Sequence, residues 1–263
     1  MTRSLAAFFS LSLLAAGLRL PGADAPERKG PKQSIEVTTT EHFNFSPGGV
    51  IRLENSYGYL TVEGWDEPKV EVTLTKSTDR FYETGEKEKA AQLFDQVRVV
   101  TDRRSDKELA IATILPARNS LLTFVLPSGR IVLSRPLPPN NKRGVTVEYR
   151  VLVPRESRLV VHQDNGYVWV SDVAGDLDVN SHTGDMIVML PDAGAYSVDA
   201  RTRLGRVSSD LVGKTSNPFL AGSHFTYLSP APARRIHLRM GRGSITIKTG
   251  GLQESGIDSP HRL

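Results

Sequence analysis

Apolar and polar residues alternate along most of the chain, which is the pattern of β-strands with one buried face. Residues 70–74, for example, read Val-Glu-Val-Thr-Leu. Residues 84–97 break this pattern because their apolar residues fall at helical spacing, and Thr84 is suited to cap the helix. We therefore expect a mostly-β protein with one short helix that covers an open end or edge of a sheet.

Glycine recurs at intervals of 9 to 11 residues between Gly166 and Gly205. The second and fourth residues after these glycines are nearly all apolar, whereas the third is largely polar. The same arrangement of apolar and polar positions, which we call a glycine frame, follows Gly58 and Gly243. Since residues two apart on a strand share a face, each short strand has one buried face. Short strands separated by glycine turns predict a β-solenoid-like (β-helix-like) stack of coils, with a two-sheet β-sandwich as the alternative.

Two strands in each coil would place successive glycine frames on alternate sheets. One sheet would then carry the frames of Gly166, Gly184 and Gly205. In that arrangement Asp185 is expected between Tyr167 and Arg206, and Asp176 opposite Ala195. The two carboxylates are thereby kept apart without a cation, so we expect no metal site and no cofactor.

The first 25 residues have the pattern of an export signal: Arg3, an apolar run from Leu5 to Leu18, and the cleavage site Ala23-Asp24-Ala25. The run is shorter than the roughly 20 residues of a membrane-spanning helix. An uncleaved N-terminal anchor is the alternative. We expect a signal peptide (1–25), a flexible leader (26–34), a single β domain (35–251) and a flexible tail (252–263). The protein would be exported, to the periplasm, the cell surface or the medium, with no transmembrane segment after cleavage.

The composition narrows the possible chemistry. The chain contains no cysteine, which excludes disulfides, thiolate metal sites and a thiol nucleophile. Its formal charge is +4, but basic and acidic residues are interspersed, so a nucleic-acid partner is not expected.

Five segments of the chain, four of which contain glycine, together form a pattern of predicted strands. They are "NSYGYLTVEGWD", "VEYRVLVP", "GYVWVSDVAGDLDVNSHTGDMIVMLP", "YSVDARTRLGRVSSD" and "RMGRGSITIKT". This pattern, over residues 35–250, resembles the bacterial putative adhesin family, a domain of unknown function with β-helix-like repeats. The resemblance implies an exported bacterial protein, periplasmic or surface-associated, without established chemistry or recognised catalytic residues.

Motifs for catalysis are incomplete. The segment "VGKTS" lacks the first glycine of a phosphate-binding loop, since residue 208 is serine. The six histidines show no helical zinc spacing. Charged residues on an exposed strand face could serve a sugar-cleaving enzyme: Asp176, Asp178, Asp185, Arg201, Arg203 and Arg206. Solubility alone also requires such residues, and we expect no enzymatic activity.

Aromatic residues give the strongest indication of a binding surface. Tyr59 and Tyr167 each follow a glycine, and Trp169 lies on the face opposite its apolar neighbours. Flat exposed rings bury area at small entropic cost and are common at contact surfaces. We therefore predict ligand binding at these three residues, unless the helix or residues 215–235, interpreted as an excursion from the core, cover them.

The expected function is that of an adhesin-like binding or interaction module of the bacterial envelope. Its partner would be a protein or polysaccharide of the cell envelope. The alternatives are a carbohydrate-active enzyme on a β-helical scaffold and a structural or envelope-stress protein that binds by its sheet edge.

Overall fold

The computed structural model describes residues 34–78, 87–95, 97–114, 122–125, 131–134, 145–192, 194–217 and 221–250. All of them belong to one compact unit, Pro31–Leu263. The predicted signal peptide and tail lie outside the described residues, as do the leader except Ser34 and the predicted helix cap Thr84.

Strands dominate the described residues, and the helix among them is α1 (Lys87–Asp95). The strands are β1 (Glu36–Asn44), β2 (Val50–Trp65), β3 (Lys69–Thr78), β4 (Arg98–Ser105), β5 (Glu108–Ile114), β6 (Leu122–Val125), β7 (Ile131–Ser134), β8 (Val145–Pro154), β9 (Arg158–Ser171), β10 (Leu177–Leu190), β11 (Tyr196–Leu204), β12 (Val207–Ser209), β13 (Lys214–Ser216), β14 (Ser223–Leu228), β15 (Arg234–Arg242) and β16 (Ile245–Thr249). The all-β prediction with one short helix is confirmed.

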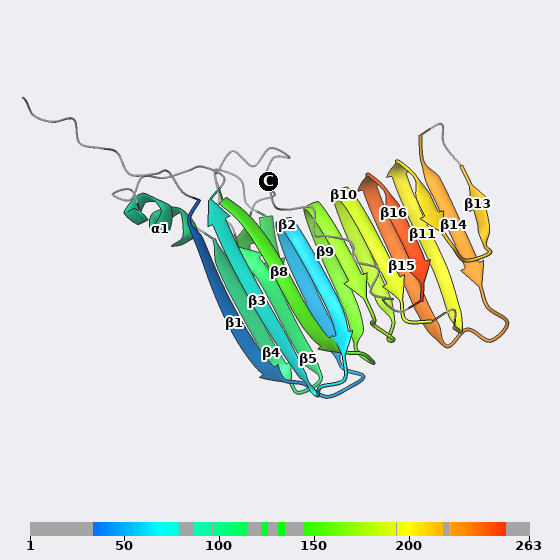
Figure 1. The fold of residues 1–263 in the computed structure, drawn as a ribbon, viewed down its shortest axis with the longest axis horizontal. Coiled ribbons are helices and arrows are strands. Elements are labelled where there is room, and N and C mark those ends of the chain that lie inside the picture. The colour runs from blue at the N-terminus through cyan, green and yellow to red at the C-terminus, as the bar shows by residue number, and fades with distance from the viewer. Residues whose placement is uncertain are drawn as a thin grey trace, which may run out of the picture. The chain divides into compact units, whose positions relative to one another are not determined.

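Fourteen of these strands are hydrogen-bonded into one sheet, in the order β1-β3-β8-β2-β9-β10-β15-β11-β14-β13 with β4, β5, β12 and β16 attached to it. Strands β2, β9, β10, β15 and β11 lie side by side and pair in parallel (Figure 1). Strands β1, β3 and β8 pair antiparallel at one end, and β11, β14 and β13 do so at the other. Strands β6 and β7 form a separate two-stranded sheet.

A column of glycines runs through the parallel strands. Gly58, Gly166 and Gly184 pair in register, and their φ angles are 106°, 129° and 130°. Residues with a side chain rarely adopt such values. A Cβ atom at residue 166 would lie 1.9 Å from the carbonyl oxygen of Gly58, and one at 184 would lie 1.8 Å from that of Gly166. Gly243 and Gly205 continue the column in the same way, at 1.6 and 2.0 Å. Only glycine allows the backbones to approach this closely.

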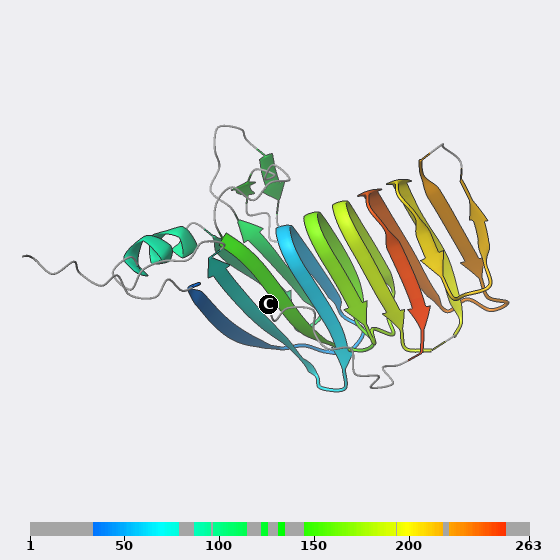
Figure 2. The same ribbon diagram turned by 45° about the horizontal axis from the view of Figure 1, so that its top comes forward.

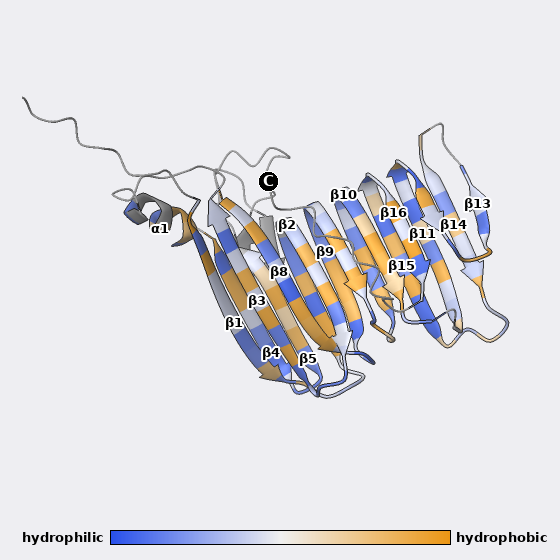
Figure 3. Cartoon of the chain, viewed as in Figure 1, coloured by the Kyte–Doolittle hydropathy of each residue, from blue (hydrophilic) through white to orange (hydrophobic). Residues whose placement is uncertain are grey.

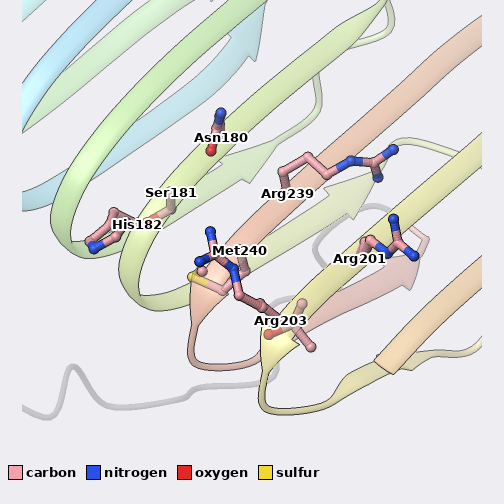
Figure 4. Close-up of a pocket in the computed structure, with 9 residues that line it drawn as sticks. Asn180, Ser181, His182, Arg201, Arg203, Arg239 and Met240 are labelled. Carbon is pink, nitrogen blue, oxygen red and sulfur yellow. The ribbon is translucent and has the colours of Figure 1, made fainter. Parts of the chain in front are cut away.

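Each long parallel strand bends at this column. The ribbon of β10 turns back on itself just after His182 (Figure 4), and Gly184 is two residues further along the chain. We call the part of each coil before the glycine the first arm and the part after it the second arm. Figure 2 shows the neighbouring strands repeating the same course. Because the strands are in register, first arms pair with first arms and second arms with second arms.

The hydrophobic core is built from the inward positions of both arms, and Figure 3 shows the alternation along the strands. One buried row on the first arms consists of Ile51, Leu159, Leu177, Ile236 and Val198. A second row, on the second arms, consists of Leu60, Val168, Met186, Ile245 and Val207. The facing predicted for the second and fourth residues after each glycine is confirmed, except that Ser209 is half-buried.

Buried polar side chains support the bend. Gln163, which is 2% exposed, donates from Nε2 to the carbonyl oxygens of Gly58 and Asn165, both at 3.0 Å. Thr202 donates to the carbonyl oxygen of Gly243 at 3.0 Å. These hydrogen bonds satisfy backbone carbonyl groups at the bend.

The order of the coils differs from the order expected from the sequence. Strands β15 and β16, which come last in the chain, lie between β10 on one side and β11 and β12 on the other. Asp185 is consequently flanked by Tyr167 and Ser244, not by Arg206, and Asp176 hydrogen-bonds to Arg235 instead of facing Ala195. The expected neighbours were wrong because the frames of Gly205 and Gly243 are alike in sequence.

The interpretation of residues 215–235 as an excursion from the core was also wrong. Strands β13 and β14 extend the sheet beyond β11, and β15 begins at Arg234. Phe225 of β14 is 3% exposed and joins the core. The prolines in this region obscured a strand whose inward positions, Ser223 and Phe225, alternate normally with outward ones.

The helix is attached to the sheet through β3. Phe94 and Val97 are buried in the core cluster, and Lys76 of β3 donates from Nζ to their carbonyl oxygens at 3.0 and 2.7 Å. Burial lowers the pKa of Lys76, although the nearby Asp95 opposes this effect. A lysine thus satisfies carbonyl groups at the C-terminal end of α1, where a cation is favourable.

Candidate ligand-binding face

The three aromatic residues singled out from the sequence lie together on the outer side of the second arms. Tyr59 of β2 and Tyr167 of β9 are register partners. Their rings are stacked, with centroids 5.3 Å apart and an angle of 3° between the planes. Parallel strands lie about 4.8 Å apart, so in-register pairing brings the two rings to stacking distance.

Trp169 lies two residues after Tyr167 and shares its outward face. Tyr167 is 50% exposed and Trp169 is 37% exposed. Neither α1 nor the segment 215–235 therefore covers these rings. A contiguous group of exposed aromatic side chains on a sheet is a feature that marks contact surfaces.

Two residues of β10 lie beside the rings of Tyr167 and Trp169. Asp185 is the register partner of Tyr167, and Ile187 is the partner of Trp169. Tyr59 stacks on one face of the half-exposed Tyr167 ring, and Asp185, which has a shorter side chain, is the register partner of Tyr167 on the other side. We call Tyr167, Trp169, Asp185 and Ile187 the aromatic ledge.

The carboxylate of Asp185 is held in position at this ledge. Its Oδ1 atom accepts a hydrogen bond from the backbone N–H of Ser244 at 2.9 Å. An ionised carboxylate has acceptor capacity for several hydrogen bonds, so Asp185 can also accept from a ligand hydroxyl. The ledge therefore combines an aromatic face with a fixed acceptor.

Of the charged residues considered for sugar cleavage, Arg201 and Arg203 line one pocket, whereas the three carboxylates are not gathered in one place. Asp176 and Asp178 lie on the first arms, whereas Asp185 begins the second arm of β10. Each is engaged by the neighbouring strand: Asp176 accepts from the backbone N–H of Arg235 at 2.8 Å, and Asp178 lies 3.1 Å from Nδ1 of His237. These contacts tie one coil to the next.

A second feature, which the sequence did not indicate, is a pocket on the outer side of the first arms (Figure 4). It has a volume of about 530 Å³. Its lining is Asn180, Ser181, His182, Arg201, Thr202, Arg203, Arg239, Met240 and Gly241. The pocket spans β10, β15 and β11, and sequence reasoning missed it because the insertion of β15 could not be foreseen.

An ion-pair cluster borders this pocket. Arg239 donates from Nη2 to Oδ2 of Asp199 at 2.6 Å and from Nη1 to Oδ1 at 3.2 Å, and Nε2 of His224 lies 2.8 Å from Oδ1. The hydrogen bond from Arg239 is the main cause that lowers the pKa of Asp199 to about 2, with His224 adding to it and burial opposing it. Asp199 is therefore fully ionised at neutral pH.

Within the described part of the chain, no three histidine, aspartate or glutamate side chains gather as they would around a metal ion. No helix in that part has the length and apolar character needed to cross a membrane.

Comparisons with known proteins give few matches. No protein-family model matches the sequence, and no curated protein does either. A putative cell adhesion protein from Clostridium sporogenes matches with a TM-score of 0.45 and 13% identity, over 82% of this chain and 100% of that one. A putative adhesin from Parabacteroides merdae matches with a TM-score of 0.29 and 9% identity, over 80% of each chain. The resemblance to the putative adhesin family remains a prediction from the sequence motifs.

Proposed function

We propose that this chain is an exported, non-enzymatic binding module that holds a polysaccharide of the cell envelope at the aromatic ledge. The observation that carries this proposal is the stacked pair of Tyr59 and Tyr167, with Tyr167 half-exposed and Asp185 as its register partner on β10. In this proposal a pyranose ring continues the stack over β10.

The chemistry of the ledge suits a sugar. One side of a pyranose ring is lined by C–H groups, which pack on an aromatic face, while its hydroxyls need hydrogen-bond acceptors at the rim. Tyr167 offers the face, and the carboxylate of Asp185 offers an acceptor. Trp169 and Ile187 extend the apolar surface along the same strands.

Rigidity of the scaffold favours binding. The ledge residues lie within long strands that are hydrogen-bonded on both sides, and the glycine column fixes where each second arm starts. Little side-chain or backbone freedom is lost when a ligand binds to such a preorganised surface. The face is open, so a polymer can extend past the ledge in both directions.

The pairing of the parallel strands also supports a proposal for the type of β fold. In-register parallel pairing of Gly58, Gly166 and Gly184 is what stacked coils require, and it favours a β-solenoid-like centre over a two-sheet β-sandwich. The antiparallel strands β1, β3 and β8 then act as a cap that covers one end of the stack.

A binding screen with matched variants tests the proposal. The purified chain, Tyr167→Ala and Trp169→Ala would be assayed against a panel of bacterial envelope polysaccharides by sedimentation with insoluble polymers and by calorimetry with soluble ones. Arg158→Ala, an exposed residue on the first arm of β9 and away from the ledge, is the control. We expect both aromatic variants to weaken binding at least about tenfold and the control to bind normally. If a bound polysaccharide is retained by both aromatic variants, the ledge is not its site.

A further inference from the structure

The pocket on the first arms carries more positive charge than its surroundings neutralise. Arg201 of β11 is the register partner of Arg239 of β15 on one side and of His224 of β14 on the other. Like charges placed directly opposite on neighbouring strands are unfavourable. Arg239 is compensated by Asp199, but among the described residues no carboxylate forms an ion pair with Arg201 or Arg203.

The backbone leaves room for a ligand beside these charges. Gly241 of β15 occupies the position between His182 of β10 and Arg203 of β11. With no side chain there, Arg203 extends across β15 toward β10 (Figure 4). A Cβ at residue 241 would lie 2.4 Å from the carbonyl oxygen of His182, so the strands also approach closely at this point.

From these observations we propose that the pocket over β10, β15 and β11 binds an oxyanion, the phosphate or carboxylate group of a larger ligand. Guanidinium groups match such groups with paired hydrogen bonds. Arg203 and Arg201 supply uncompensated donors, Arg239 is held in place by Asp199, and Asn180 and His182 complete the polar lining. Asp164 of β9, whose pKa burial raises, interacts electrostatically with His182.

The volume of the pocket indicates more than a bare ion. A space of about 530 Å³ falls in the range of small-molecule sites and exceeds what one phosphate occupies. The site is separate from the aromatic ledge, which lies on the second arms, so the two can be tested independently.

Calorimetric titration tests this site. The wild-type chain, Arg203→Gln and the control Arg158→Gln, an exposed arginine of β9 outside the pocket, would each be titrated with inorganic phosphate, glucose 6-phosphate and glucose at low salt. We expect saturable binding of the two phosphates, a loss of at least about tenfold in Arg203→Gln and an unchanged affinity in Arg158→Gln. Tighter binding of glucose 6-phosphate than of phosphate would support a larger ligand, whereas equal binding would contradict it and would leave the free ion as the ligand.

Three other results would overturn the proposal: no saturable binding of either phosphate at about 10 mM, a range in which even weak sites fill; equal losses in Arg203→Gln and Arg158→Gln; or binding of glucose as tight as that of glucose 6-phosphate. Circular dichroism of each variant shows whether it is folded. If Arg203→Gln does not fold, Arg201→Gln takes its place with the same expected loss.

Discussion

The ring of Tyr167 stacks on the ring of Tyr59 at a centroid distance of 5.3 Å, although 108 positions separate them in the sequence. This contact exists because β2 and β9 are parallel and in register, with Gly58 beside Gly166. The fold therefore turns two isolated tyrosines into one surface.

Replacing Gly184 by alanine should destabilise the fold strongly. Its φ of 130° is unfavourable for alanine, and the new Cβ would lie 1.8 Å from the carbonyl oxygen of Gly166. We expect a loss of at least about 3 kcal/mol in the free energy of unfolding, measured by urea denaturation. Gly48→Ala is the control, because Gly48 also has a positive φ but nothing within 4 Å of the added Cβ, and it should cost about 1 kcal/mol. Equal losses would show that close approach at the column is unimportant.

The facing of β10 is tested by two neighbouring substitutions. Val179 is 0% exposed and pairs with Val161 and Leu238, so Val179→Asp buries an unpaired charge and should cost at least about 3 kcal/mol. Asp178 faces outward beside His237, and Asp178→Asn should cost less than about 1 kcal/mol. Thermal unfolding of both variants provides the comparison, and similar shifts in Tm would contradict the assigned facing.

The ion-pair cluster predicts a specific acid dependence. The pKa of Asp199 is lowered from 3.8 to about 2 in the folded chain. Because the folded value lies below the unfolded one, this stabilisation is complete above about pH 4 and is lost as the pH falls toward 2. Asp199 is partly exposed, so solvent screening keeps the effect small. Titration of the Asp199 carboxyl signal by NMR should give a midpoint near 2, and a midpoint near 4 would show that the bond to Arg239 does not persist in solution.

The role of the Tyr167 ring can be separated from that of its hydroxyl. Tyr167→Phe keeps the ring face and the stack with Tyr59, so we expect it to retain polysaccharide affinity within about threefold, whereas Tyr167→Ala loses the stacking surface. Calorimetry with a bound polysaccharide measures both affinities. If Tyr167→Phe binds as poorly as Tyr167→Ala, hydrogen bonding by the hydroxyl, not ring stacking, holds the ligand.

The sequence predicts which side chains face the core, but it does not predict which strands lie next to each other. A period of two determines which side chains are buried, and Leu177, Met186 and Ile245 are all buried as expected. The same pattern does not say which coil lies beside which. Frames after Gly205 and Gly243 are both compatible with the place next to β10, and the structure puts the later one there.

Because the order of the strands cannot be predicted from the sequence, surfaces that depend on neighbouring strands cannot be predicted either. The outward facing of Tyr59, Tyr167 and Trp169 could be predicted, because each lies one residue away from an apolar inward position. The arginine pocket could not, since it requires Arg239 of β15 to lie between Asn180 and Arg201, from strands that precede it in the chain. Likewise, β14 was missed because prolines surround it.

Fluorescence of Trp169 tests the binding proposal most directly. The chain has two tryptophans, so Trp65→Phe leaves Trp169 as the reporter. Trp65 lies outside the aromatic ledge, where its Nε1 donates to the carbonyl oxygen of Lys69 at 2.9 Å, and its replacement should leave the ledge intact. On addition of a bound polysaccharide we expect the emission of Trp169 to shift to shorter wavelength, saturating at the concentration that saturates binding. An emission spectrum that stays unchanged while the polysaccharide is fully bound would contradict the proposed site.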